Sequence, residues 1–251
     1  MNYDGHRSMF ESRSKNRKGL LMWMSHPCWP SMVWQTYDYY FEPTAGYFAI
    51  KKASEPLHIQ WNPVTDEVEV VNYSAGVQEG LVAKVQVLNM NASVAWEEEV
   101  TLDSHEDTTN KCIQLEFPDS LSKVHFIKMT LTKEGKLLSE NFYHRSKEEN
   151  NYQELRQLPR ISLQSDVKVK KEKDGQWLAT VTLQNKTSVP ALNIRLNVVG
   201  EQDGLQFLPI FYSDNYFSLL PGEEKLITIC WKDEDTRGNK PKVLISGYNV
   251  D

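Results

Sequence analysis

The chain has 251 residues, of which 40% are hydrophobic and 25% charged, an ordinary balance for a soluble globular protein. Its net charge of -6 and pI near 5.6 argue against nucleic acid or an anionic membrane as the main partner, because phosphate binding needs a concentrated basic surface. The longest apolar run, residues 20–24 (LLMWM), is too short to cross a bilayer. We therefore expect no nucleic-acid partner and no membrane span.

The three cysteines, Cys28, Cys112 and Cys230, lie far apart and form no CxxC or Cys/His ligand spacing. An odd number leaves at least one thiol unpaired, so a disulfide framework is not expected. We predict no metal site and no cofactor.

The first fifty or so residues differ in pattern from the rest. Tyr3, Arg7 and Phe10 fall at helical spacing, residues 20–24 are typical of a strand buried on both faces, and Ser31 is a suitable N-cap for a second helix. This order of helix, buried strand, loop and helix is one slice of an α/β fold, and no partner strands for it occur in the chain.

From residue 55 the hydrophobic period changes to two, which indicates strands. Seven short strands in about ninety residues predict an antiparallel, immunoglobulin-like β-sandwich over residues 55–146. The predicted strands cover residues 57–61, 67–70, 82–88, 94–102, 112–117, 124–131 and 137–143.

Residues 147–160 are charged and polar, and we interpret them as a linker. A second immunoglobulin-like sandwich is predicted for residues 161–251, where Asp174-Gly175 is a hairpin signal and Pro221-Gly222 marks another turn. Its predicted strands cover residues 167–171, 177–183, 192–199, 226–231 and 243–248. The fold class predicted for the whole chain is therefore mainly β, with a short α/β segment at residues 1–54.

Four stretches of the sequence resemble glycoside hydrolase family 2, and most closely its exo-β-glucosaminidases and the endo-β-mannosidases that act on glycoprotein glycans. They are residues 19–31 (GLLMWMSHPCWPS), 34–40 (WQTYDYY), 51–60 (KKASEPLHIQ) and 241–249 (PKVLISGYN). The strong match covers roughly residues 1–62, and the sandwiches match mainly in layout.

The resemblance implies that residues 1–54 are the end of a catalytic (β/α)8 barrel. Residues 1–18 would be its seventh helix, residues 20–24 its eighth strand, and the segment from Ser31 to about Ser54 its closing helix. Chemistry in such barrels takes place at the C-terminal ends of the strands.

The resemblance also implies three substrate-binding residues. Trp23 matches the family's eighth-strand tryptophan, which lines the sugar subsite at the point of cleavage, and Trp29 resembles a second wall of the pocket. His26 is a candidate polar contact to sugar hydroxyls. A flat indole suits the role of Trp23 because the apolar face of a pyranose stacks on it.

No catalytic residue is assigned. Retaining members of the family use two carboxylic residues about 5–5.5 Å apart, and by resemblance these end the fourth and seventh barrel strands. On this mapping the chain begins after the seventh strand, so no Glu or Asp here takes either role.

Less specific interpretations of these residues stay open. From spacing alone Trp23 is a core residue of a buried strand, and Trp29 is a packed loop anchor between two prolines. A nucleophile pair of His26 and Cys28 lacks an orienting third group, and Asp38 is better explained as a structural hydrogen-bond partner in a helix. Tyr212, Tyr216 and Phe217 are either a carbohydrate platform or sandwich core.

Three functional classes follow. The first is the C-terminal accessory region of a family 2 retaining β-glycosidase, which hydrolyses β-glucosaminides or β-mannosides through its complete barrel. The second is a non-catalytic carbohydrate-binding or scaffold module, and the third is an adhesion-type double sandwich. The resemblance implies a secreted or periplasmic location. We also expect residues 1–54 to fold back on the first sandwich or to mediate self-association, because a lone buried strand leaves a large apolar patch.

Overall fold

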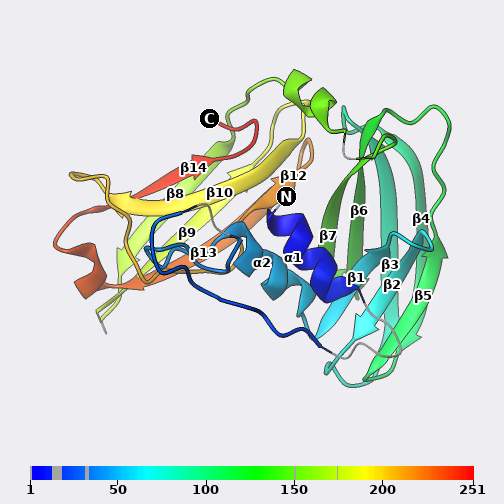
Figure 1. The fold of residues 1–251 in the computed structure, drawn as a ribbon, viewed down its shortest axis with the longest axis horizontal. Coiled ribbons are helices and arrows are strands. Elements are labelled where there is room, and N and C mark those ends of the chain that lie inside the picture. Colours follow the sequence, from blue (N-terminus) through cyan, green and yellow to red (C-terminus); the bar gives the residue numbers. More distant parts are fainter. Residues whose placement is uncertain (1, 13–18, 32–33, 150, 174) are drawn as a thin grey trace. The chain divides into compact units, whose positions relative to one another are not determined.

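The computed structural model describes residues 2–12, 19–31, 34–149, 151–173 and 175–251. These fall into two compact units (Figure 1). The first unit comprises Met1–Leu21 and Ala49–Gln157, and the second comprises Met22–Phe48 and Leu158–Asp251. Each unit thus combines a piece of the N-terminal region with one of the predicted sandwiches.

The first unit contains two antiparallel sheets. One has the strand order β1-β2-β5 and the other β4-β3-β6-β7. The strands are β1 (Leu57–Asn62), β2 (Glu67–Asn72), β3 (Gln78–Asn89), β4 (Val94–Ser104), β5 (Thr108–Gln114), β6 (Val124–Lys133) and β7 (Lys136–Ser146). The mainly β, sandwich-type fold predicted for this part is confirmed.

Alternating apolar residues of these strands form the core of the first unit. In β3 the side chains of Leu81, Ala83, Val85 and Val87 are buried, and the residues between them are partly exposed. They share one hydrophobic cluster with Ile59 of β1 and with residues of β2 and β6. Because side chains alternate across a strand, this pattern brings a single face of each sheet into the core.

The second unit is also a pair of antiparallel sheets, with strand orders β11-β13-β9-β8 and β12-β10-β14. The strands are β8 (Gln164–Lys171), β9 (Gln176–Gln184), β10 (Ala191–Gly200), β11 (Phe211–Tyr212), β12 (Phe217–Leu219), β13 (Glu224–Lys232) and β14 (Pro241–Ser246). The second predicted sandwich is therefore confirmed as a β-rich unit. Short 3-10 helices occupy Gln153–Gln157 in the predicted linker and Asp233–Thr236 after β13.

Buried asparagines connect the loops of the second unit to its strands. The side chain of Asn215 accepts a hydrogen bond from Leu196 N at 2.8 Å and donates to Leu196 O at 2.9 Å. Asn249 similarly accepts from Leu192 N at 3.0 Å and donates to Pro190 O at 2.9 Å. These amides satisfy backbone groups of β10 and of the residue before it that would otherwise be buried without partners.

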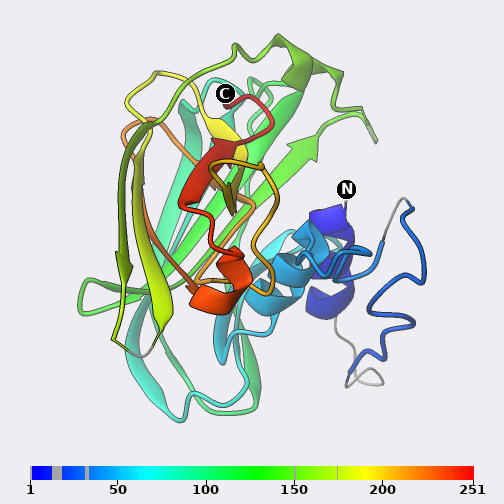
Figure 2. The same ribbon diagram turned by 90° about the vertical axis from the view of Figure 1, so that its left-hand side faces the viewer.

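The N-terminal region differs from the sequence prediction. Helix α1 spans Asn2–Glu11 and helix α2 spans Ala45–Ala53, so the helix expected from Ser31 begins fourteen residues later than predicted. Residues 20–24 form no strand, and Figure 2 draws the segment before α2 as a blue trace without arrows. The physical reason is pairing: a strand of a parallel sheet needs neighbouring strands for its backbone hydrogen bonds, and none of the described strands pairs with this segment. Residues 13–18, predicted to extend the first helix, lie outside the described residues.

Among the described residues, no helix has the length and apolar character needed to span a membrane.

Candidate functional site

All three residues predicted to contact sugar lie in the second unit, in the irregular segment that precedes α2. Trp23 is 82% exposed and Trp29 is 67% exposed. Trp23 is therefore not a core residue, and Trp29 is not a packed loop anchor, so both of these interpretations are wrong. Both indoles are free of the protein core, which is the state an aromatic residue needs in order to stack on a sugar.

His26 is engaged by its own loop. Its ring stacks on Phe41 with centroids 4.1 Å apart and an interplanar angle of 13°. Its Nε2 atom lies 3.1 Å from the backbone oxygen of Tyr39. The structure brings His26 together with these loop residues, and one of its two ring nitrogens is occupied by that contact.

Asp38 organises the turn that presents this loop. Its Oδ1 atom accepts hydrogen bonds from Tyr40 N at 2.8 Å and from Glu42 N at 2.9 Å. The expected structural role of Asp38 is thus confirmed, although it lies in a turn and not in a helix. A carboxylate that folds back on following backbone N–H groups is the usual cause of such a turn.

The C-terminal end of the irregular segment before α2 is anchored to the second sandwich. Glu42 forms an ion pair with Arg195 of β10 and accepts a hydrogen bond from Gln206 Nε2 at 2.7 Å. Phe48 packs edge-on against Tyr212, with ring centroids 6.1 Å apart. Tyr212 and Phe217 are 8% exposed, so these two aromatics belong to the core and not to a carbohydrate platform.

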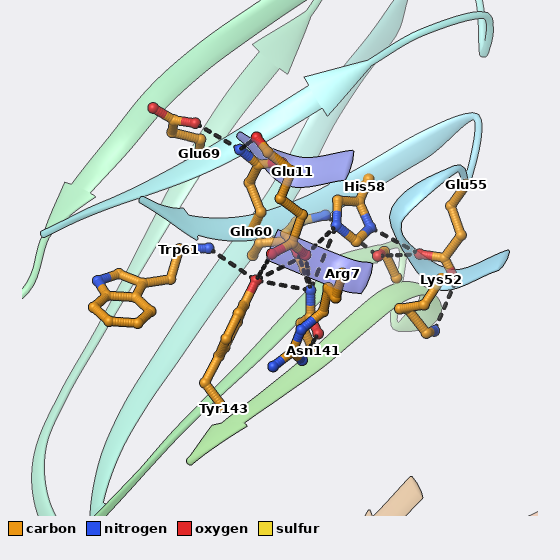
Figure 3. Close-up of polar contacts among 12 residues, drawn as sticks. Arg7, Glu11, Lys52, Glu55, His58, Gln60, Trp61, Glu69, Asn141 and Tyr143 are labelled. Atoms are coloured by element: carbon orange, nitrogen blue, oxygen red, sulfur yellow. Dashed lines mark hydrogen bonds and ion pairs between the residues drawn. The ribbon is translucent and has the colours of Figure 1, made fainter. Parts of the chain in front are cut away.

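A separate cluster of polar side chains is buried in the first unit, and Figure 3 shows it in close-up. It joins α1 to the neighbouring strands β1 and β7, and we call it the α1 cluster. Its members are Arg7 and Glu11 of α1, Glu55 between α2 and β1, His58 and Gln60 of β1, and Ser139, Asn141 and Tyr143 of β7.

Glu11 is the centre of the α1 cluster. Tyr143 Oη lies 2.9 Å from each of its carboxylate oxygens, and Asn141 Nδ2 donates to Oε1 at 2.9 Å. His58 Nε2 lies 2.9 Å from the same Oε1 atom. Burial raises the pKa of Tyr143 well above its usual value, so its hydroxyl stays a hydrogen-bond donor to Glu11.

Arg7, one helical turn before Glu11, lies on the same face of α1. Its Nη1 atom donates to Asn141 Oδ1 and to the backbone oxygen of Phe142, both at 2.7 Å. The guanidinium also stacks over the Tyr143 ring, 3.8 Å from its centroid. Arg7 and Glu11 therefore give α1 two charged, fully bonded contacts with β7.

The α1 cluster resembles a catalytic arrangement, since a histidine lies between two carboxylates, but its burial argues against catalysis. Glu11 is 6% exposed and His58 is fully buried, so a sugar has no access to them. Each carboxylate is already filled with donors from the protein. The arrangement is suited to holding a helix, not to bond cleavage.

Sequence reasoning missed this cluster, although one signal for it was present. In β1 the polar His58 and Gln60 alternate with the apolar Leu57, Ile59 and Trp61, and such a strand is normally read as having one face in water. Here both faces are buried. The second signal was the spacing of Arg7 and Glu11, which places two charged residues on one face of a helix that must pack against another surface.

Comparison with known proteins relates the chain to glycosidases. A family model for the exo-β-D-glucosaminidase Ig-fold domain matches residues 141–250. The exo-β-D-glucosaminidase of Amycolatopsis orientalis is 30% identical over 278 residues, covering 99% of this chain and 27% of the relative. The mannosylglycoprotein endo-β-mannosidase of Lilium longiflorum is 22% identical over 317 residues, covering 99% of this chain and 33% of the relative.

A solved structure gives the same result for the fold. The crystal structure of the exo-chitosanase CsxA of Amycolatopsis orientalis matches with a TM-score of 0.90 and 29% identity, covering 99% of this chain and 33% of that one. The chain thus spans between 27% and 33% of the length of these relatives. Residues 141–250 thus match the exo-β-D-glucosaminidase Ig-fold domain, and the chain as a whole is similar to a portion of these glycosidases.

Proposed function

We propose that this chain is the C-terminal accessory region of a family 2 retaining β-glycosidase, and that it lacks the catalytic acid/base and the nucleophile. The observation that carries the proposal is the similarity over 99% of the chain to an exo-β-D-glucosaminidase three to four times its length. Residues 1–54 would then be the end of the catalytic barrel, and the two sandwiches would follow it. The substrate class of the complete enzyme would be β-linked glucosamine or mannose.

The carboxylates described above support the absence of catalysis by the chain alone. Glu11 is saturated inside the first unit, Asp38 is occupied by its turn, and Glu42 is paired with Arg195. A retaining mechanism needs two carboxyl groups about 5–5.5 Å apart on either side of an accessible glycosidic bond. None of these three side chains is free for that role.

Hydrolysis of nitrophenyl β-glucosaminide and nitrophenyl β-mannoside tests the proposal. We expect no turnover by the 251-residue chain and measurable turnover by a version extended upstream through a complete barrel. The preferred sugar of the extended version identifies the substrate. Turnover by the short chain would show that a carboxylate pair within it performs the chemistry and would overturn the proposal.

Trp23 is proposed as a wall of the sugar subsite in the extended version, with Trp29 as a second wall and His26 as a polar neighbour. We expect Trp23→Ala to lower kcat/KM by roughly tenfold or more, because the stacking surface for the pyranose is lost. Trp34→Ala is a matched control, since Trp34 is a similarly exposed indole, at 64%, of the same segment. Equal kinetic effects of the two substitutions would remove Trp23 from the subsite.

The second candidate function is a non-catalytic carbohydrate-binding or scaffold module. It is favoured by the exposure of Trp23 and Trp29, and a solved complex of CsxA with PNP-β-D-glucosamine shows that the related enzyme binds this class of ligand. Calorimetric titration of the 251-residue chain with glucosamine oligomers separates the two candidates. Binding without hydrolysis, unchanged by extending the chain upstream, favours the module.

Self-association through residues 1–54 is also proposed. Several large apolar side chains of this region are exposed, namely Leu21, Trp23, Met24, Trp29, Trp34, Tyr40 and Phe41. Apolar groups gathered in one segment favour association with another surface. Crosslinking and solution scattering measure the oligomeric state, and a compact monomer at all concentrations contradicts the proposal.

A further inference from the structure

Both ring nitrogens of His58 face carboxylate oxygens. Nε2 lies 2.9 Å from Glu11 Oε1, and Nδ1 lies 3.3 Å from Glu55 Oε2 (Figure 3). An ionised carboxylate only accepts hydrogen bonds, and a neutral imidazole has a single N–H. The geometry therefore requires either an imidazolium or a protonated carboxylate.

Both carboxylates also accept hydrogen bonds from groups other than His58. Glu11 receives the hydroxyl of Tyr143 and the amide of Asn141. Glu55 receives Lys52 Nζ at 2.7 Å and the Ser139 hydroxyl at 2.6 Å. Donors aimed at a carboxylate stabilise its charged form, and these hydrogen bonds, together with that from His58, outweigh burial and lower the pKa of Glu55.

Several charged groups of the elements packed around His58 are paired. Arg7 pairs with Asp4, Lys52 with Glu55, and His58 with Glu11. Other titratable groups on these elements include Tyr3 and His6 of α1, Glu69 of β2, which accepts from Gln60, and Glu140, Tyr143, His144 and Arg145 of β7. Burial lowers the pKa of His144 to about 4, so that ring is neutral at neutral pH.

We propose that His58 is a protonation-dependent latch that strengthens the attachment of α1 to the first sandwich while both of its ring nitrogens carry a proton. Loss of one proton turns a ring N–H donor into a lone pair that faces a carboxylate oxygen. It also removes a positive charge that is hydrogen-bonded to the buried Glu11 carboxylate, which is costly. Helix α1 is then held only by its remaining contacts, such as those of Arg7 with β7, while the apolar sandwich core stays folded.

The direction of the pH dependence follows from the same contacts. Burial alone lowers the pKa of His58, but the hydrogen bonds and charges of Glu11 and Glu55 outweigh it and raise the pKa above its usual value. A group with a raised folded-state pKa stabilises the folded form at pH values below its unfolded pKa, about 6.5 for histidine, and loses that contribution as the pH rises through the folded value. The attachment of α1 is thus strongest below about pH 6.5 and weakens as the pH rises from there to the raised pKa of His58.

Amide hydrogen exchange of the 251-residue chain between pH 5 and pH 10 tests the latch. After correction for the intrinsic exchange rate, we expect protection of α1 to fall by up to tenfold per pH unit between about pH 6.5 and the His58 midpoint, and to level off above that midpoint. Protection of β6, in the core of the same unit, stays constant. NMR of ring-labelled histidine gives the His58 midpoint directly, and α1 protection should level off at that pH.

Variants distinguish the latch from a merely structural contact. His58→Gln should give an α1 protection that does not change with pH, and His105→Gln, at an exposed histidine of the same unit, should leave the profile as it is. If His58→Gln fails to fold, Glu55→Gln serves instead. The amide introduced at position 55 can pair with a neutral His58 ring, so the titration midpoint of His58 should move to lower pH. A His58 ring that is neutral at pH 6, or α1 protection that is flat while the ring titrates, overturns the proposal.

Discussion

Replacing Glu11 with alanine is expected to lower the free energy of unfolding of the first unit by about 3–5 kcal/mol, the range for removing one partner of a buried ion pair. The substitution leaves His58 as a buried cation with one carboxylate fewer, and it leaves the Tyr143 hydroxyl and the Asn141 amide without their acceptor. Each of these polar groups would then be buried without that partner, so a hydrogen bond to Glu11 would no longer offset its desolvation cost.

Urea titration with pulsed hydrogen exchange, read on the amides of β6, measures this loss in the first unit alone. Glu97→Ala is the matched control, because Glu97 lies on the largely exposed strand β4 of the same unit and pairs with Lys84 of β3. Exposed ion pairs contribute little to stability, so Glu97→Ala should leave the urea midpoint of the first unit unchanged. A shift for Glu11→Ala as small as that of the control would show that the α1 cluster does not stabilise the unit.

The second large effect is expected in the second unit. Phe207 is fully buried, packs against Trp231 at a centroid distance of 6.2 Å, and carries the Arg237 guanidinium 5.7 Å from its ring centre. Phe207→Ala should lower the free energy of unfolding of this unit by about 3–5 kcal/mol, since a buried aromatic ring is exchanged for a cavity.

Phe211→Ala provides the comparison for Phe207, because Phe211 is the same residue type four positions away and is 64% exposed. Its removal should change stability by less than about 0.5 kcal/mol, as for most surface substitutions. The amides of β9 report on this unit in the same urea experiment. Similar losses for the two variants would mean that the region around Phe207 rearranges to fill its space.

The β-strands could be predicted from the sequence because their signal is local. Alternation of apolar residues in β3 and β9 requires only the side-chain period of a strand. The two-residue β11 and three-residue β12 were missed, since so short a stretch shows no period. The end of β5 was also placed too late, at residue 117 and not at Gln114, because apolar residues continue beyond the last ladder hydrogen bonds.

The segment before α2 could not be predicted in the same way. The apolar run at residues 20–24 indicates a strand only if other strands pair with it, and that condition is not local. The role of His58 is likewise non-local, because it depends on a helix 47 residues earlier in the chain and on β7 more than 80 residues later. The sequence pattern placed Trp23 in a buried strand and Trp29 in the loop after it, whereas both are exposed in the structure.

The three free cysteines differ in their exposure, so one of them can be labelled selectively. Cys112 is half-buried, and burial raises the pKa of its thiol to about 12, so almost no reactive thiolate forms at neutral pH. Cys230 is half-buried in β13, whereas Cys28 is exposed between His26 and Trp29. A thiol-reactive fluorophore applied briefly at neutral pH therefore attaches preferentially at Cys28, beside the indole proposed to face the sugar, and can report on ligand arrival without any engineered residue.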